Sequence, residues 1–437
     1  MRPVTRHIAQ FSVDMRLQDI SDAALDTVRT IVLDTVGVTV AGSRTEAGRI
    51  VADYAGSTGQ GGRARIIGRS ITTAPALAAL ANGTSAHALD FDDRGHFSAH
   101  CLAGALAVAE DTGASGADFL RAFVAAREVA HRLSQSIDAN RSQGRGPTHR
   151  GWYTVGLVST IASAVAAAML LELGVERTAS AIGIAAANAG GVRRNQGTMA
   201  KALSAGGAHD GVRAAFLAQA GFTGDREVLE APLGLFAALC QPDELDLTPL
   251  TNRLGAPFTV EEGTDIKPYP ACTPSHAAIA AVLELRSQYG FSSVDIVSIE
   301  TDLKTWSMFR VAPRDDCEAG FCVPYLLAVA VVAGRVGIEQ LSERYRRDRE
   351  VTDLMARVRE PADHDGLVIR LTDGRLLHRP LLSSVIGSAP TLTGASIVEK
   401  FRDCVTPSLG ERGCHTLLEQ LAAIDSVRDV RTLQLAD

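Results

Sequence analysis

Residues 87–100 hold the densest group of side chains that could carry chemistry. Three carboxylates and three imidazoles lie within fourteen residues, and they are Asp90, Asp92, Asp93, His87, His96 and His100. Carboxylates and imidazoles can move protons, bind a substrate or hold a metal ion. Aspartates that cap a helix would explain one of the carboxylates but not the whole group. The segment therefore predicts an acid/base or substrate-binding loop.

A metal site is the second interpretation of this segment. His96 and His100 have the i, i+4 spacing that places two ligands on one face of a helix. Gly95 interrupts the residues that lead into them, and no H-E-x-x-H pattern is present. We therefore favour proton transfer over metal binding.

Cations gather in a second segment, residues 190–201, which also contains glycines. Its cations are Arg193, Arg194 and Lys201. The spacing fits neither a phosphate-binding P-loop nor a dinucleotide-binding turn, and solvated surface cations are the simple alternative. Because the chain carries a net charge of −7, an anionic substrate would need its cations concentrated in one site.

A proline-dense segment, residues 267–276, contains Lys267, Tyr269 and His276. Proline fixes the backbone, so these side chains could be held rigidly, although a stiff connection between domains is the alternative. Cys101 and Cys272 lie in or beside these polar segments. Free cysteines are more often inert apolar side chains, and no partner residue is evident, so we do not favour a thiol nucleophile.

The bulk composition limits the class of protein. A chain of 437 residues is too long for one simple core and indicates two domains. The negative net charge argues against nucleic acid as the main partner. Seven scattered cysteines without a C-x-x-C pair, and a beginning without an apolar signal segment, predict a cytoplasmic protein. Residues 151–171 lack charged side chains but are mostly small, so we expect a buried helix and no membrane span.

The elements that must position these segments change type along the chain. Apolar periodicity and capping predict helices at 21–42, 75–89, 102–110, 118–133, 155–173, 177–189 and 208–220. After about Pro257, the β-branched run 294–301 predicts a strand, and Asp373-Gly374 between two apolar runs predicts a hairpin. Helices at 275–289 and 324–336 would pack on that sheet.

The end of the chain is again helical. Helices are predicted at 395–405 and 411–424, and Pro407 is the expected stop of the first one. The predicted fold class is therefore mainly α with a second, α+β domain.

Seven segments in this order resemble the MmgE/PrpD family, whose members include dehydratases, decarboxylases and epimerases of small polycarboxylates. They are residues 33–43, 82–93, 197–201, 221–224, 267–272, 321–325 and 399–401. Each segment alone is weak evidence, whereas seven in register are specific.

The resemblance implies a large all-helical domain built from both chain ends, residues 1–257 and 393–437. It implies a smaller α/β-sandwich-like domain at 258–392, with the active site between the two. It also implies a homodimer, no metal ion and no organic cofactor.

Five residues match positions that are presumed catalytic or substrate-binding in the family, namely Asp90, His100, Lys201, Lys267 and Tyr325. Four positions depart from the family pattern. Tyr153 and Ser204 stand where many members have histidine, Gly320 replaces a lysine, and Arg94 replaces a small polar residue. These departures predict a substrate other than that of the best-known members.

The chemistry implied is proton transfer next to a carboxylate of a small di- or tricarboxylic acid. The proton is weakly acidic, so the developing negative charge needs cations in a site shielded from water. Lys201 would fill that role together with the candidate binding residues, which are Lys267, Arg94, Arg193 and His276.

We favour a dehydratase or decarboxylase, in which His100 or Asp90 is the base and Tyr153 or Tyr325 the acid. An epimerase is the alternative, with Tyr153 and Lys201 on opposite faces of one carbon. A non-catalytic family member is the third possibility, and only the Tyr153 and Ser204 departures favour it.

Overall fold

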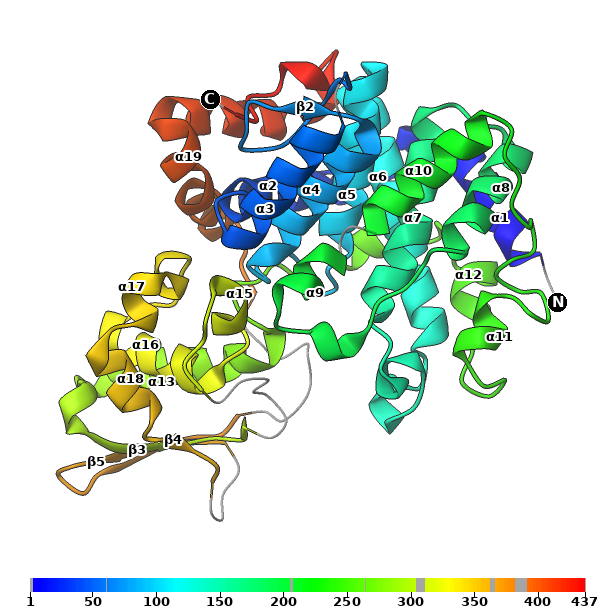
Figure 1. Cartoon of the computed structure of the whole chain (residues 1–437). Helices are drawn as coiled ribbons and strands as arrows, with labels where there is room; N and C mark the ends of the chain where they lie inside the picture. The colour runs from blue at the N-terminus through cyan, green and yellow to red at the C-terminus, as the bar shows by residue number, and fades with distance from the viewer. Residues whose placement is uncertain are drawn as a thin grey trace.

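The computed structural model describes most of the chain. The described residues are 3–59, 61–204, 207–263, 265–303, 311–361, 366–381 and 391–436, without the side chain of Ser204. The protein is mainly helical, with a smaller part that contains a sheet, as the sequence predicted (Figure 1).

Small side chains allow the central helices to approach closely. These are α2 (Asp22–Gly42), α4 (Pro75–Ala88), α5 (Phe97–Thr112), α6 (Gly116–Ile137), α7 (Thr154–Leu170) and α10 (Gly207–Gln219). α7 packs against α5, α6 and α10. A Cβ atom at Gly211 would lie 2.4 Å from the backbone oxygen of Thr160, so glycine is required where α10 crosses α7.

The remaining helices of this part are shorter or lie at its edge. They are α1 (Val4–Asp14), α3 (Glu46–Thr58), α8 (Val175–Ala186), α9 (Met199–Ser204), α11 (Leu235–Leu239) and α12 (Thr248–Asn252). Two helices begin as the sequence predicted. The Ser21 hydroxyl caps α2 by accepting a hydrogen bond from the Ala24 amide, and Pro75 is the first residue of α4.

α7 contains most of the uncharged segment that could have been taken for a membrane span. Nearly all of its side chains are buried inside the protein. None of the described helices combines the length and the apolar character that crossing a bilayer would require.

A four-stranded sheet forms the base of the second part. Its strands are β3 (Ile296–Glu300), β4 (Val358–Arg359), β5 (Leu367–Leu371) and β6 (Leu376–Arg379), in the order β4-β3-β5-β6. β3 runs parallel to β4 and antiparallel to β5, and β5 and β6 form the hairpin predicted at Asp373-Gly374.

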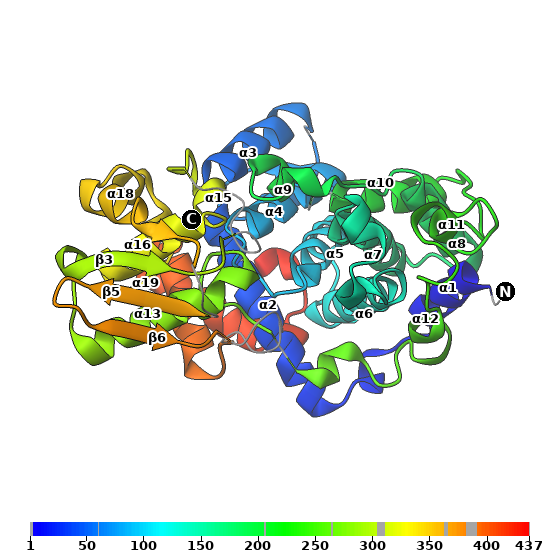
Figure 2. The ribbon, with the colours of Figure 1, turned by 90° about the horizontal axis from the view of Figure 1, so that it is seen from below.

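One row of apolar side chains crosses this sheet. Ile299 pairs with Val358 and with Ile369, which in turn pairs with Leu377, and all four are buried. Paired residues on neighbouring strands point to the same face. Helices cover one face of the sheet, as Figure 2 shows, and they are α13 (His276–Tyr289), α16 (Val323–Ala333) and α18 (Arg349–Met355). The short helices α15 (Asp316–Ala319) and α17 (Glu343–Arg346) lie nearby.

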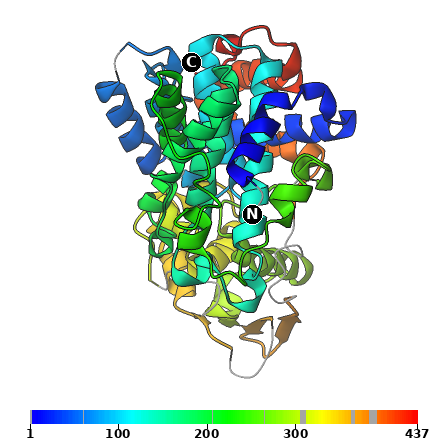
Figure 3. The ribbon, with the colours of Figure 1, turned by 90° about the vertical axis from the view of Figure 1, so that its right-hand side faces the viewer.

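The last long helix, α19 (Ala395–Ala422), packs against α2, far from it in sequence. Figure 3 shows the last residues of the chain, in red, at the end of the molecule opposite the sheet. The predicted helix stop at Pro407 is wrong, because the helix continues past it and breaks at Gly410, with φ 65° and ψ 174°. A proline removes only its own N–H bond and can be accommodated by a kink, whereas the backbone angles of Gly410 are not helical.

Candidate active site around Asp90

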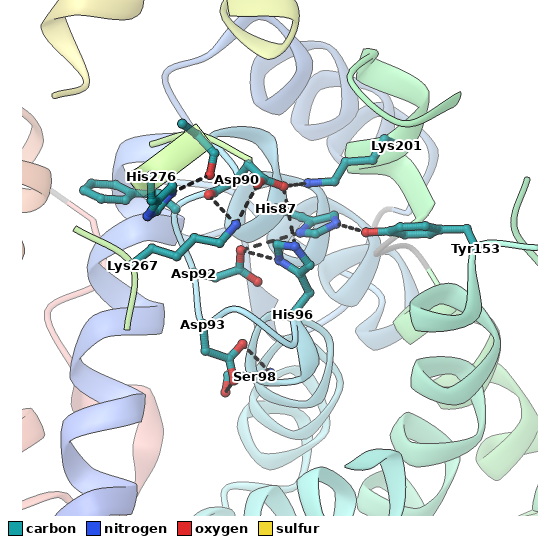
Figure 4. Close-up of polar contacts among 12 residues, drawn as sticks. His87, Asp90, Asp92, Asp93, His96, Ser98, Tyr153, Lys201, Lys267 and His276 are labelled. Carbon is teal, nitrogen blue, oxygen red and sulfur yellow. Dashed lines mark hydrogen bonds and ion pairs between the residues drawn. The ribbon is translucent and has the colours of Figure 1, made fainter. Parts of the chain in front are cut away.

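The loop between α4 and α5 carries the centre of the candidate site. Asp90 and His96 have φ angles of 50° and 60°, an uncommon conformation for residues with a Cβ atom. Such strain costs about 1–3 kcal/mol and is concentrated at functional sites. The loop directs Asp90, Asp92 and His96 toward one interior region (Figure 4).

Two lysines from distant segments bind the carboxylate of Asp90. Lys201 of α9 forms an ion pair with Oδ1, and Lys267 Nζ lies 2.6 Å from Oδ2. Lys267 also donates to the backbone oxygen of Asp90 at 2.8 Å. All three side chains are buried, Lys267 with no exposed surface at all. The fold thus brings together three of the residues that the sequence predicted.

The charge state of Asp90 follows from these neighbours. Burial by itself raises the pKa of this carboxyl, but the ammonium groups of Lys201 and Lys267 outweigh burial and hold the pKa well below its ordinary value. Asp90 is therefore an ionised carboxylate between two cations. An ionised acid held in this way is a poor proton acceptor and a good anchor for lysines.

Imidazoles surround the other side of the loop. His96 Nδ1 lies 2.9 Å from Asp92 Oδ1, and the rings of His87 and His96 meet edge to face at 4.5 Å. The ring of His100 lies 5.2 Å from that of His87, and neither of its nitrogens has a hydrogen-bond partner among the described residues. His87 Nε2 lies 2.8 Å from the hydroxyl oxygen of Tyr153.

Burial keeps His87 and His100 uncharged. It lowers the pKa of His100 to about 3, and burial together with Lys201 lowers the pKa of His87 well below its ordinary value. Burial and the carboxylates of Asp90 and Asp92 raise the pKa of Tyr153 well above 10. The site therefore combines neutral imidazoles, which can accept a proton, with a tyrosine that keeps its proton.

A cavity opens onto this group. Its volume is about 240 Å³, and Tyr153 and Lys201 line it together with Asn195, Gln196 and the backbone at Gly191. That volume suits a small organic acid. The ring of Phe321, from the segment before α16, lies 5.2 Å from the Lys201 ammonium, so the second part of the protein also borders the site.

A metal ion would fit poorly here. Ligand atoms of His87, Asp90 and His96 lie within 4.8 Å of one another, a spacing that could hold a cation. However, the Asp90 carboxylate already binds two ammonium groups, which would repel a divalent ion. His96 and His100, weighed above as a possible pair of metal ligands, do not share a helical face, because His96 precedes α5 with a left-handed backbone.

The other predicted binding residues lie at varied distances from this centre. Arg94 is buried and pairs with Asp265 at 2.9 Å, and burial lowers its pKa despite that carboxylate. Arg193 is exposed and donates to the backbone oxygen of Thr148. His276 is buried, and its Nε2 lies 2.9 Å from the backbone oxygen of Ala271.

Tyr325 has a different environment from that predicted. It is buried in α16, and its hydroxyl donates to the backbone oxygen of Gln340. The charged groups that act on its pKa are Arg346 and Asp316, and burial raises that pKa. No contact described for Tyr325 joins it to the group around Asp90.

Two departures from the family pattern concern positions without a described side chain. Gly320 has none, and its backbone oxygen accepts a bond from the Cys272 amide, beside the proline-dense segment. The side chain of Ser204 lies outside the described residues.

His87, Asp92 and His96 were absent from the predicted catalytic set, although the predicted loop included them. Only the contacts in the folded structure show which residues of that loop belong to the site. His87 is the clearest addition, because it lies in the last turn of α4 and contacts Tyr153, sixty-six positions along the chain.

Family models match two long stretches of the sequence. The MmgE/PrpD N-terminal domain matches residues 6–248, and the MmgE/PrpD C-terminal domain matches residues 269–425. The chain belongs to the MmgE/PrpD family.

Curated relatives carry the name of one activity. The cis-aconitate decarboxylase of Homo sapiens is 25% identical over 84% of this chain and 78% of its own length. The enzyme of the same name from Mus musculus is 24% identical over 82% and 76%, and that from Aspergillus terreus is 23% identical over 98% and 95%. These MmgE/PrpD relatives are lyases by name, at a low level of identity.

Proposed function

We propose that this protein is a cofactor-independent lyase, of the decarboxylase or dehydratase type, that acts on a small di- or tricarboxylic acid. One observation carries the proposal: buried Asp90 pairs with Lys267 and with Lys201, and Lys201 lines a cavity together with Tyr153. The relatives named as decarboxylases support the same reaction class.

The lysines would bind and stabilise negative charge. A substrate carboxylate that enters the cavity meets the Lys201 ammonium at its wall. In a site shielded from water, such a cation stabilises a developing carbanion more strongly than it would in solution. Asp90 fixes the lysines before the substrate arrives, so little reorganisation is needed during the reaction.

In decarboxylation, the bond between the carbon skeleton and one carboxylate breaks and carbon dioxide leaves. The electron pair stays on the skeleton and spreads into a remaining carboxylate near Lys201. Tyr153 then donates its proton to carbon, and its phenolate must be reprotonated before the next turnover. The high pKa of Tyr153 suits this step, because the proton is released only to a strongly basic carbanion.

In dehydration, a neutral base must first remove a proton next to the carboxylate. His100 is a candidate, because burial keeps it unprotonated and both of its nitrogens lack partners among the described residues. Tyr153 would then protonate the departing hydroxyl group. Both lyase reactions thus use Tyr153 as the acid and the lysines as the charge-stabilising groups.

An epimerase is the second candidate, because Tyr153 and Lys201 line the same cavity. Two-base epimerisation needs one of the pair deprotonated and the other protonated. Here Lys201 forms an ion pair with Asp90, and the raised pKa of Tyr153 keeps its hydroxyl protonated. The charge states therefore favour a lyase.

Proton NMR in deuterium oxide would test the proposal with a panel of acids: cis-aconitate, citrate, 2-methylcitrate, iminodisuccinate and tartrate. We expect loss of a carboxylate with deuterium at the vacated carbon, or new olefinic signals from dehydration. A new diastereomer without either change would identify an epimerase instead. No reaction with any acid would contradict the proposed function and favour a non-catalytic family member.

The homodimer that the family resemblance implies, and a cytoplasmic location, belong to the same proposal. Light scattering on the purified protein would show twice the mass of one chain if the dimer forms.

A further inference from the structure

Lys400 forms a buried junction beside the site that the proposed mechanism does not use. It lies on α19 and is 5% exposed. Its Nζ lies 2.7 Å from Asp34 Oδ1 on α2. It also donates to the backbone oxygen of Phe91 at 2.6 Å and to that of Lys267 at 3.1 Å.

These contacts join the ammonium group to three segments of the chain. Lys400 forms one ion pair and two hydrogen bonds, each to a different segment of the chain. The same ammonium lies 3.9 Å from the centre of the Phe91 ring. Few arrangements of the surrounding backbone would satisfy all of these contacts at once.

Two of the contacts hold main chain that belongs to the site. Phe91 directly follows Asp90 in the strained loop, and Lys267 supplies the other half of the 2.6 Å pair with Asp90. Lys400 therefore holds the backbone on both sides of that pair. Asp34, in the helix against which α19 packs, fixes the ammonium in turn.

Stability alone does not account for a buried pair of this kind. Removing two charges from water is costly, and apolar residues of similar volume often stabilise a protein equally well. Burial outweighs Lys400 and raises the pKa of Asp34 to about 6, so the carboxylate gains little from its environment.

We propose that Lys400 is a positioning residue that sets the separation of Asp90 and Lys267, with Asp34 as its anchor. The inference rests on the proposed function only in assigning Asp90 and Lys267 to the active site. Lys400 contacts backbone atoms and Asp34, and it acts on the substrate through the residues it holds.

The test compares Lys400→Met with a matched control, Arg132→Met. Arg132 is also fully buried, pairs with Glu128 at 2.8 Å and donates to the backbone oxygen of Pro257 at 2.7 Å. Both variants lose a buried cation and should unfold at lower temperature. Below that temperature, we expect Lys400→Met to lose at least tenfold in kcat with a smaller change in KM, and Arg132→Met to stay within twofold of wild type.

A double-mutant cycle distinguishes a positioning role of Lys400 from a purely structural one. In a Lys267→Met background, Lys400→Met should cause little further loss of kcat, because the residue that it positions is gone. Fully additive losses in the cycle would overturn the proposal. Equal kcat in Lys400→Met and Arg132→Met would also overturn it. If Lys400→Met does not fold, Asp34→Asn serves instead, with the same direction and a smaller loss.

A crystal structure of Lys400→Met, or of Asp34→Asn, tests the proposal without turnover. We expect Lys267 Nζ to move away from Asp90 Oδ2, and an unchanged pair would overturn the inference. Inactivity of the wild type toward every acid would count against the proposed function and not against this geometric result.

Discussion

Individual side chains in this site take their charge states from burial and from one another. Asp90 is ionised between two lysines, the buried imidazoles of His87 and His100 are neutral, and Tyr153 keeps its proton. That combination supplies cations, a proton acceptor and a proton donor within one buried group, which is what chemistry next to a carboxylate requires.

Tyr153→Phe tests the proton donor. It removes the hydroxyl that contacts His87 and keeps the ring in the cavity wall. We expect kcat to fall roughly 10²–10⁴-fold, as is typical for loss of a general acid, with little change in KM. Steady-state kinetics on the acid identified by NMR gives both values. An unchanged kcat would assign proton donation to another group.

Tyr325→Phe should behave differently. The hydroxyl of Tyr325 bonds to the backbone of Gln340 and not to the group around Asp90. We expect kcat near that of wild type and a loss of about 1 kcal/mol in unfolding free energy, from the missing hydrogen bond. Urea denaturation and turnover of the same preparation check both. A large loss of kcat at unchanged stability would support the catalytic role predicted from the sequence.

At the residue scale, the sequence predicted the polar segments of the site better than it predicted the contacts between their side chains. The loop at 87–100 was predicted from its density of carboxylates and imidazoles, and Lys201 and Lys267 from the family resemblance. The contact of His87 with Tyr153 spans two separate helical segments, so no spacing along the chain could reveal it.

A few helix ends and backbone conformations position the residues of this site. α4 ends at Ala88, and the left-handed backbone of Asp90 and His96 shapes the turn into α5. α19 reaches the site from the far end of the chain through Lys400. Most long helices and the hairpin were predictable, because apolar periodicity and turn residues are local signals. α5 begins earlier than predicted, at Phe97, so His100 lies inside it.

Gly410→Ala tests the break in α19. Its φ of 65° and ψ of 174° are nearly restricted to glycine, although a Cβ atom there would meet no neighbour. We expect a loss of about 1–3 kcal/mol in unfolding free energy from backbone strain alone. Gly174→Ala is the control, since that site is equally open but has a φ of −72°. Equal stability of the two variants by urea denaturation would contradict the strain argument.

The whole molecule buries titratable groups at the site, and its stability should depend on pH accordingly. Burial lowers the pKa of both His100 and His276 to about 3, whereas the unfolded chain binds these protons near pH 6.5. The unfolded state therefore gains protons first as pH falls. The contribution of each neutral histidine to the free energy of unfolding is fully present above pH 6.5. It is lost between pH 6.5 and 3, by up to about 1.4 kcal/mol per pH unit for each histidine.

His100→Gln isolates one of these contributions. Asp34, with a pKa raised to about 6, acts in the opposite direction below that pH, so the difference between variant and wild type is the informative quantity. Urea denaturation between pH 7 and 5 should show a shallower dependence for His100→Gln. Parallel curves would mean that His100 is protonated in the folded protein.

At the scale of the molecule, the mainly α fold with a second, sheet-containing part was predictable from composition and pattern. The family resemblance assigned Asp90, Lys201 and Lys267 to one site. The ion pairs of both lysines with Asp90, and the contact of Lys201 with Phe321, were not predictable, because they depend on how distant segments pack. The domain boundaries inferred from the family resemblance stay a prediction.

The most direct test of the account is the turnover of Lys201→Met beside that of Arg194→Met. Both remove a cation from the same segment, but Lys201 binds Asp90 and lines the cavity, whereas Arg194 is exposed. We predict that Lys201→Met loses at least a hundredfold in kcat/KM on the reacting acid and that Arg194→Met keeps wild-type activity. Full activity in Lys201→Met would contradict the assignment of this buried group as the active site.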